Sequence, residues 1–295
     1  MSARAAAAAR RSISRPILSG EGIPKARLSC RRASGAGPVP PDPSPPRQEA
    51  DPDQRDVIAF LSNPETYPAA HGPVKRLDTH GAMVFLSGER AIKIKKPVAF
   101  SYMDFSTLEK RRRAITREYE INAPHAPTLY LKVLPITREP SGQLALGGKG
   151  EVVEWALIMR RFRQSRLLSA MADDGGLERD LMTRLARVIA RLHQSAPAHL
   201  TARPLKALKT RIEHNEQACR NYPEFFEETR IDALFSRFHE ILEQRAGDFN
   251  KRGEEGFVRR CHGDLHLRNM VLLAGEPVLF DAIEFDEEIA TIDIL

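Results

Sequence analysis

One stretch near the carboxyl end combines acidic, amide and histidine side chains at a fixed spacing. It reads Cys261-His262-Gly263-Asp264-Leu265-His266-Leu267-Arg268-Asn269. Phosphoryl transfer to an alcohol uses a carboxylate beside the attacking hydroxyl and, five residues later, an amide that binds a metal ion. Asp264 and Asn269 have that separation, so the spacing predicts a catalytic base and a magnesium ligand.

A further acidic residue is needed to hold magnesium against nucleotide phosphates. The segments 270–273 and 278–280 are typical of two strands, and the turn Ala274-Gly275-Glu276-Pro277 joins them into a hairpin. Asp281 follows this hairpin directly. We therefore expect Asp281 to be the second metal ligand.

A lysine that contacts ATP phosphates is expected on a strand of the amino-terminal half. In Ala91-Ile92-Lys93, strand alternation points Lys93 away from its apolar neighbours. Such a lysine needs a carboxylate to orient it, and the helix predicted over 107–122 offers Glu118 and Glu120. Residues two apart lie on different sides of a helix, so only one of them can face the sheet, and we choose Glu118.

The elements that must position these residues follow a recognisable order. A short amphipathic helix that ends near Pro64 precedes strands over 74–77, 82–86 and 91–94, the helix over 107–122, and strands over 129–136 and 152–159. Helices are predicted over 181–192, 205–222 and 224–249. This order predicts an α+β fold of two lobes, with the first at residues 55–162 and a helical second lobe at residues 163–295.

Residues 1–54 differ in composition from the rest of the chain. The segment is rich in Ala, Arg, Ser and Pro, which favours a disordered basic tail over a folded domain. Its arginines also resemble a transit peptide, but no apolar core of a secretory signal follows them. Residues 1–50 hold nine Lys or Arg and three Asp or Glu, which leaves 36 of each in the remainder. The net charge of +6 therefore belongs to the tail and does not indicate nucleic-acid binding by the folded part.

Composition excludes several other classes of protein. Cys30, Cys219 and Cys261 have no CxxC spacing, which argues against a disulfide framework and a structural zinc site. No stretch approaches the roughly 20 apolar residues of a membrane-spanning helix. We therefore expect a cytoplasmic protein with no membrane partner, in which Cys219 and Cys261 fill the core.

Several residues also have plainer interpretations. His262 and His266 could bind a metal, but Gly263 disfavours a shared helix, so His262 is expected to hold the backbone near the metal hairpin and His266 to face the substrate or solvent. The basic groups at 93–96 and 110–113 lack interleaved aromatic residues and favour solvated surfaces over nucleic-acid contacts. His193 is expected near a helix end as a partly charged imidazole. Asp286 and Asp293 are interpreted as capping residues.

From about Asp56 to Leu295 the chain resembles the aminoglycoside phosphotransferase superfamily, whose members have a kinase-like fold. The resemblance is nearest to a bacterial subgroup described as bifunctional aminoglycoside phosphotransferase/ATP-binding proteins. The matching pieces, in order, are Val84-Phe85-Leu86, Ala91 to Pro97, Asp104 to Leu108, Met159 to Phe162, His262 to Asn269 and Leu279 to Asp286.

This resemblance implies an ATP- and Mg²⁺-dependent transfer of phosphate to a hydroxyl of a small molecule. Lys93 would bind the phosphates, Asp264 would be the base, and Asn269 and Asp281 would ligate magnesium. Met159, Arg160, Arg161 and Phe162 would form the hinge that binds adenine. The acceptor pocket would be built by the helices between Arg163 and Arg260.

The sequence departs from the superfamily pattern at two places. The loop Thr79-His80-Gly81-Ala82-Met83, expected to cover the phosphates, has a single glycine. The chain also stops soon after the metal hairpin, where related proteins continue and the subgroup adds a nucleotide-binding domain. No GxxxxGK[ST] sequence is present, so a P-loop domain would have to lie downstream in a longer parent chain. A regulatory or pseudokinase module is the alternative function, and the absence of an activation segment argues against a protein kinase.

Overall fold

The computed structural model describes residues 52–67, 72–100, 102–200 and 204–294. The predicted tail therefore lies outside the described residues as far as residue 51. Helix α1 (Pro52–Ser62) begins at Pro52, so the predicted boundary after residue 54 is wrong and falls inside this helix. Gln54 is 2% exposed and its Nε2 donates to Glu154 Oε2 at 2.9 Å, which makes this turn of the helix part of the first lobe.

The first lobe is built on an antiparallel six-stranded sheet with the order β1-β2-β3-β8-β6-β7. Its register pairs Val84 with Lys93 and Lys93 with Leu157, which places all three side chains on one face. The predicted strands are present, and β7 is an addition that the sequence analysis missed. The strands are β1 (Lys75–Asp78), β2 (Ala82–Ser87), β3 (Arg90–Lys95), β6 (Tyr130–Arg138), β7 (Leu144–Leu146) and β8 (Glu151–Arg160).

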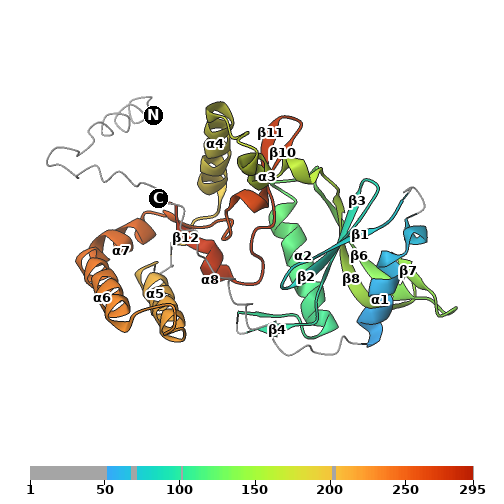
Figure 1. Cartoon of the computed structure of the whole chain (residues 1–295), viewed down its shortest axis with the longest axis horizontal. Helices are drawn as coiled ribbons and strands as arrows, with labels where there is room; N and C mark the ends of the chain where they lie inside the picture. The colour runs from blue at the N-terminus through green and yellow to red at the C-terminus, as the bar shows by residue number, and fades with distance from the viewer. Residues whose placement is uncertain (1–51, 68–71, 101, 201–203, 295) are drawn as a thin grey trace, which may run out of the picture. The chain divides into compact units, whose positions relative to one another are not determined.

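Helices α1 and α2 (Leu108–Asn122) pack on opposite faces of this sheet (Figure 1). Val57 and Leu61 of α1 join a core cluster with Ile92 and Ile94. On the other face, Ile115 of α2 packs in a second cluster with strand residues whose side chains alternate with the first set. Strand alternation therefore sends polar side chains of β3 toward α2.

Helix α2 begins where the sequence predicts. The Thr107 side chain caps the helix by accepting a hydrogen bond from the Lys110 N–H at 3.3 Å. Before the helix, a small hairpin of β4 (Ala99–Phe100) and β5 (Met103–Asp104) lies next to the turn between β1 and β2. The short helix η2 (Pro64–Thr66) follows α1.

The second lobe is mainly helical. The helix predicted over 224–249 is present but starts later and is divided in two, because the chain forms a turn at Tyr222–Phe226 and breaks again at Arg245, which caps α6 and precedes Gly247. Glycine lowers helix propensity, which favours the second break. The helices are η3 (Gln164–Arg166), α3 (Leu168–Asp173), α4 (Arg179–Ser195), α5 (Pro204–Arg220), α6 (Glu228–Gln244) and α7 (Ala246–Glu254).

The carboxyl-terminal part contains the predicted hairpin. Strands β10 (Met270–Leu273) and β11 (Glu276–Leu279) pair with Leu272 opposite Pro277. The predicted four-residue turn is therefore too long: Ala274 and Gly275 alone make it, with φ values of 49° and 86°, as in two-residue hairpins. The remaining elements are β9 (Val258–Arg260), η4 (Leu267–Asn269), α8 (Glu287–Ala290) and β12 (Thr291–Asp293), with β12 paired to β9.

None of the helices in the described part of the chain is both long enough and apolar enough to cross a membrane.

Candidate active site

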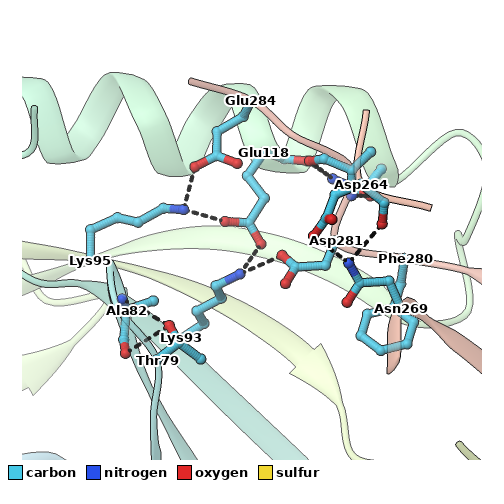
Figure 2. A network of polar contacts seen from close by, with 12 residues as sticks. Thr79, Ala82, Lys93, Lys95, Glu118, Asp264, Asn269, Phe280, Asp281 and Glu284 are labelled. Carbon is cyan, nitrogen blue, oxygen red and sulfur yellow. Dashed lines mark hydrogen bonds and ion pairs between the residues drawn. The ribbon is translucent and has the colours of Figure 1, made fainter. Parts of the chain in front are cut away.

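Lys93 lies on β3 and points to the face of the sheet that α2 covers. Its Nζ donates to Glu118 Oε1 at 2.7 Å and to Asp281 Oδ1 at 2.7 Å. The Glu118 side chain is fully buried, whereas Glu120 is exposed and lies 3.8 Å from Arg117. The structure therefore brings together the lysine, the helix carboxylate and the acidic residue after the hairpin (Figure 2).

Both members of the Lys93–Asp281 pair stay charged at neutral pH. Burial alone would lower the pKa of Lys93, but the carboxylates of Asp281 and Glu118 outweigh it and raise that pKa well above its ordinary value. Burial would raise the pKa of Asp281, and the Lys93 ammonium holds it below its ordinary value instead. The Asp281 side chain keeps 40% of its surface exposed. It can therefore still meet a ligand from solvent.

Asp281 adopts a backbone conformation that residues other than glycine seldom show. Its φ is 61°, in the left-handed region, which costs an ordinary residue roughly 1–2 kcal/mol. Tyr130 Oη accepts a hydrogen bond from the Asp281 N–H at 3.0 Å and helps to hold this conformation. Strained residues of this kind concentrate at active and ligand-binding sites.

Asn122 and His262 hold the residues on either side of Asp281. Asn122, at the end of α2, accepts a hydrogen bond from the Ala282 N–H at 2.9 Å. His262 Nδ1 accepts from the Asp264 N–H at 3.3 Å, and burial lowers the pKa of the ring. The ring is therefore neutral with its proton on Nε2, which donates to Phe280 O at 2.8 Å. The predicted structural role of His262 is confirmed.

Asp264 is held through one of its two carboxylate oxygens. Asn269 Nδ2 donates to Asp264 Oδ2 at 3.0 Å, and His266 Nε2 lies 3.3 Å from the same oxygen. Among the described residues, none donates a hydrogen bond to Oδ1. The side chain is 50% exposed, so Oδ1 can accept a proton from a group that approaches from solvent.

His266 is oriented by the backbone of the loop that follows it. Its Nδ1 accepts a hydrogen bond from the Arg268 N–H at 3.2 Å. In the neutral ring the proton then sits on Nε2, the atom that faces Asp264. The imidazole is 48% exposed, and this nitrogen lies 3.3 Å from the Asp264 carboxylate.

Asn269 and Asp281 supply oxygen donors of the kind that Mg²⁺ prefers. The Asn269 amide nitrogen donates to Asp264, and the Asn269 backbone carbonyl accepts from the Phe280 N–H at 3.0 Å, one residue before Asp281. Within the described part of the chain, no group of three or more His, Cys, Asp or Glu side chains could hold a metal ion. With two oxygen donors, Asn269 and Asp281 fit a cation that is bound by few protein groups and completes its shell with phosphate and water.

The predicted hinge, Met159 to Phe162, leaves the end of β8. The Arg160 N–H donates to Leu129 O and the Arg161 N–H to Glu89 O, both at 2.8 Å. The Phe162 N–H is the one amide of these three that has no protein acceptor among the residues described. The side chains of Arg160 and Arg161 are exposed.

Apolar side chains lie between this hinge and Lys93. Val84 and Ala91 share the sheet face of Lys93 and pack in one cluster with Met159. The rings of Phe162 and Phe280 join the same cluster, with centroids 5.4 Å apart.

The turn between β1 and β2 is closed by its own backbone. The Thr79 N–H donates to Ala82 O at 2.9 Å, and the Lys96 N–H donates to Gly81 O at 2.8 Å. A Cβ at Gly81 would lie 3.0 Å from Met103 Sδ and 3.1 Å from the Phe105 ring. Close packing against the neighbouring hairpin therefore gives this single glycine a structural role.

A cavity of about 1010 Å³ lies beside the loop that carries Asp264. Gly263 and Leu265, the neighbours of Asp264, line one side, and Asp286 and Glu288 contribute acidic groups. Helix α5 supplies much of the polar lining, through Thr210, Arg211, His214, Asn215 and Gln217, and Asn221 follows directly after the helix. The helices of the second lobe thus form part of this cavity's wall.

Sequence reasoning missed Lys95, which it grouped with solvated charges. Its side chain is 4% exposed, and Nζ lies 2.7 Å from Glu118 Oε2 and 2.5 Å from Glu284 Oε1. The signal was available, because Lys95 stands two residues beyond Lys93 on the same strand and so shares its face. The basic group at 110–113 was also expected to be solvated, but its Arg111 is 3% exposed and donates to Glu154 Oε2 at 2.7 Å.

The remaining candidates take structural positions. Asp286 Oδ1 accepts from the Ile289 N–H at 3.0 Å and so caps α8, and Asp293 pairs with Arg252 at 2.6 Å. His193 lies in the last turn of α4, but burial lowers its pKa, which makes the expected partial charge wrong. Cys261 is buried, and burial raises its pKa to about 11, as expected of a core residue.

The sheet with its covering helix, the helical second lobe and the site between β3, α2 and the carboxyl-terminal hairpin together define a kinase-like phosphotransferase fold of the α+β class. Comparison with known families matches residues 109–281 to the phosphotransferase enzyme family, APH. The chain belongs to this family. The narrower resemblance to the bifunctional subgroup stays a prediction.

Curated relatives come from mycobacteria. The uncharacterized protein Rv2004c of Mycobacterium tuberculosis and the uncharacterized protein Mb2027c of Mycobacterium bovis are each 33% identical over 220 residues. The aligned region covers 73% of this chain and 42% of either relative. The chain thus spans less than half the length of these relatives.

Among solved structures, a choline/ethanolamine kinase family protein from Mesorhizobium loti is similar at 15% identity and a TM-score of 0.41, over 78% of this chain and 65% of that one.

Proposed function

We propose that the protein transfers the terminal phosphate of ATP, with Mg²⁺, to a hydroxyl group of a small molecule. The observation that carries this proposal is the convergence of five groups from distant parts of the chain. Lys93 meets Glu118 and Asp281, and Asn269 links Asp264 to the neighbourhood of Asp281 (Figure 2). Family membership supports the reaction class.

Each of these residues would have a separate role in the transfer. Asp264 Oδ1 would accept the proton of the acceptor hydroxyl as its oxygen bonds to the γ-phosphorus and the bond to the leaving ADP oxygen breaks. Lys93 would bind and orient the phosphates, and Glu118 would keep its ammonium group in place. Asn269 and Asp281 would hold Mg²⁺, which neutralises charge on the phosphoryl group. Positioning and electrostatic stabilisation supply nearly all of such catalysis.

We place the adenine at the hinge and the acceptor in the cavity beside Asp264. The Phe162 N–H offers a hydrogen bond to a ring nitrogen, and the apolar cluster around Val84 and Phe280 offers surfaces for stacking. The cavity holds both acidic and neutral polar groups, which suits an acceptor with several hydrogen-bonding groups.

The test combines nucleotide binding with a screen for phosphate transfer. ATP and Mg²⁺ are offered with sugars, amino alcohols and aminoglycosides, and phosphorylated products are detected by mass spectrometry. Nucleotide at about a hundred times its Kd should add about 2.7 kcal/mol of stability, which raises Tm by roughly 5–10 °C. Asp264→Asn should retain this stabilisation and lose about 10²–10⁴-fold in turnover. Lys93→Met should lose both.

Asp173→Asn serves as the matched control, because Asp173 is an exposed residue at the end of α3. It should match the wild type in both measurements. Unchanged turnover in Asp264→Asn would refute the assignment of the base. Nucleotide stabilisation of the wild type without ATP hydrolysis or transfer would instead support a regulatory nucleotide-binding module.

A further inference from the structure

Lys95 is a second buried lysine that the proposed chemistry does not use. It shares the sheet face of Lys93, and its Nζ lies between Glu118 Oε2 and Glu284 Oε1. The three side chains are at most 6% exposed. The ammonium group also lies 5.1 Å from the centroid of the Phe105 ring, within the range of a cation–π contact.

The five charged groups form an alternating row. In order they are Asp281, Lys93, Glu118, Lys95 and Glu284, and each neighbouring pair is separated by 2.5–2.7 Å. Each oxygen of Glu118 contacts one lysine. A buried charge is costly unless it is paired and hydrogen-bonded, and alternation gives every member at least one partner of opposite sign.

The two ends of the row belong to one short segment. Asp281 and Glu284 are three residues apart, so the two lysines of β3 hold the same piece of chain at two points. The backbone between these points is held by Tyr130 through Asp281 N and by Asn122 through Ala282 N. Glu284 is therefore the last tether of the segment to the sheet.

The two tethers differ in their exposure to ligands. A phosphate that binds Lys93 and a cation that binds Asp281 both compete with the Lys93–Asp281 contact. The Lys95–Glu284 contact includes neither group, and both of its side chains are buried. It can persist through a reaction that loosens the first contact.

We propose that Lys95 and Glu284 are positioning residues that keep the Asp281 segment against β3 while phosphate and cation engage Lys93 and Asp281. This inference rests on the proposed function. Lys95 also contacts the second oxygen of Glu118, so Lys93 makes a single bond to that carboxylate and, beside its bond to Asp281, keeps a third hydrogen for phosphate.

The central variant is Lys95→Met combined with Glu284→Gln. Lys95→Met alone would leave Glu284 buried without its partner and can fail to fold, whereas the double variant removes one charge of each sign. Lys132→Met makes the same substitution at an exposed position on β6 of the same sheet. It controls for the loss of a lysine as such.

The first measurement is amide hydrogen exchange of the protein without ligand, followed at Asp281, Ala282 and Ile283. The double variant should exchange these amides about tenfold faster or more, because the segment opens locally more often. Lys132→Met should match the wild type. Exchange at the wild-type rate in a folded double variant would overturn the proposal.

The second measurement is ADP affinity with Mg²⁺ and with EDTA. Loss of groups that support a metal site typically costs 10–100-fold in metal affinity, so the gain in ADP affinity from Mg²⁺ should shrink by about tenfold in the double variant. Affinity in EDTA should change far less. A merely structural pair would lower Tm and leave the Mg²⁺ gain intact, which would overturn the positioning role. If the wild type binds no nucleotide in either buffer, the proposed function fails, and exchange alone decides whether the pair holds the segment.

Discussion

Removal of one hydroxyl, in Tyr130→Phe, isolates the hydrogen bond that supports the backbone of Asp281. Tyr130 is 2% exposed, and its Oη accepts from the Asp281 N–H at 3.0 Å. Burial raises the pKa of this phenol well above its ordinary value, so it remains a neutral hydroxyl throughout the accessible range. Phenylalanine keeps the ring and its packing and removes only the acceptor.

The size of the effect follows from the amide that is left without a partner. An unpaired buried donor costs about 1–3 kcal/mol. The Asp281 side chain is 40% exposed, so water can reach part of this site. We therefore expect the lower part of that range, about 1–2 kcal/mol, which corresponds to a fall in Tm of roughly 2–8 °C. The left-handed conformation of Asp281 should also be held less firmly, so that Mg²⁺ adds less to nucleotide affinity.

The assay is urea unfolding, with Tyr119→Phe as the matched control. Tyr119 Oη donates to Leu131 O at 3.4 Å, a long bond that should contribute at most about 0.5 kcal/mol. Equal losses in the two variants would refute the argument, because the short bond to Asp281 would then have no special weight.

A substitution and a change of pH test the charges of the site. In urea unfolding, Glu118→Gln should lower stability by about 3–5 kcal/mol, because it leaves two buried ammonium groups short of a partner. The control Glu120→Gln, at an exposed position, should stay within about 0.5 kcal/mol of the wild type in the same titration. Stability should also depend on pH. The pKa of Asp281 is lowered by Lys93 against the effect of burial, and that of Glu287 is likewise lowered by arginines. Such groups bind protons more readily when unfolded, so the stability present above about pH 4 is lost as pH falls below it. A Tm that stays level between about pH 6 and pH 3 would contradict this.

The chemistry-bearing residues could be chosen from the sequence because their spacing is local. Asp264 and Asn269 are five residues apart in one loop, and Lys93 is fixed by strand alternation. The choice of Glu118 over Glu120 needed only helix geometry, and the structure places Glu118, not Glu120, against the sheet. The order of strands and helices along the chain and the two-lobed fold followed from periodicity and turn residues, whereas the order of strands within the sheet was not predicted.

What the sequence could not supply is the environment of each charge. Lys95 and Arg111 stand in basic runs that are typical of solvated surfaces, and their burial depends on Glu284 and Glu154, acids far away in the chain. Tyr130 accepts a hydrogen bond from the backbone amide of Asp281, and a contact to the backbone cannot be recognised from the types and spacing of residues. The break at Arg245 lies within a sequence pattern that is typical of one continuous helix, and tertiary packing determines where that helix ends.

The conformation of the loop that carries Asp264 depends on residues that come later in the chain, as Gly263 shows. Its φ is 82°, and a Cβ there would lie 3.2 Å from Ala290 Cα. The Cys261 N–H donates to Ala290 O at 2.6 Å, which fixes the same approach from the other side. During synthesis, Asp264 therefore leaves the ribosome before Ala290, against which its loop packs, has emerged. The loop can take its final form only once Ala290 has emerged, so a ribosome that pauses ahead of this point would present the loop unformed to chaperones and proteases.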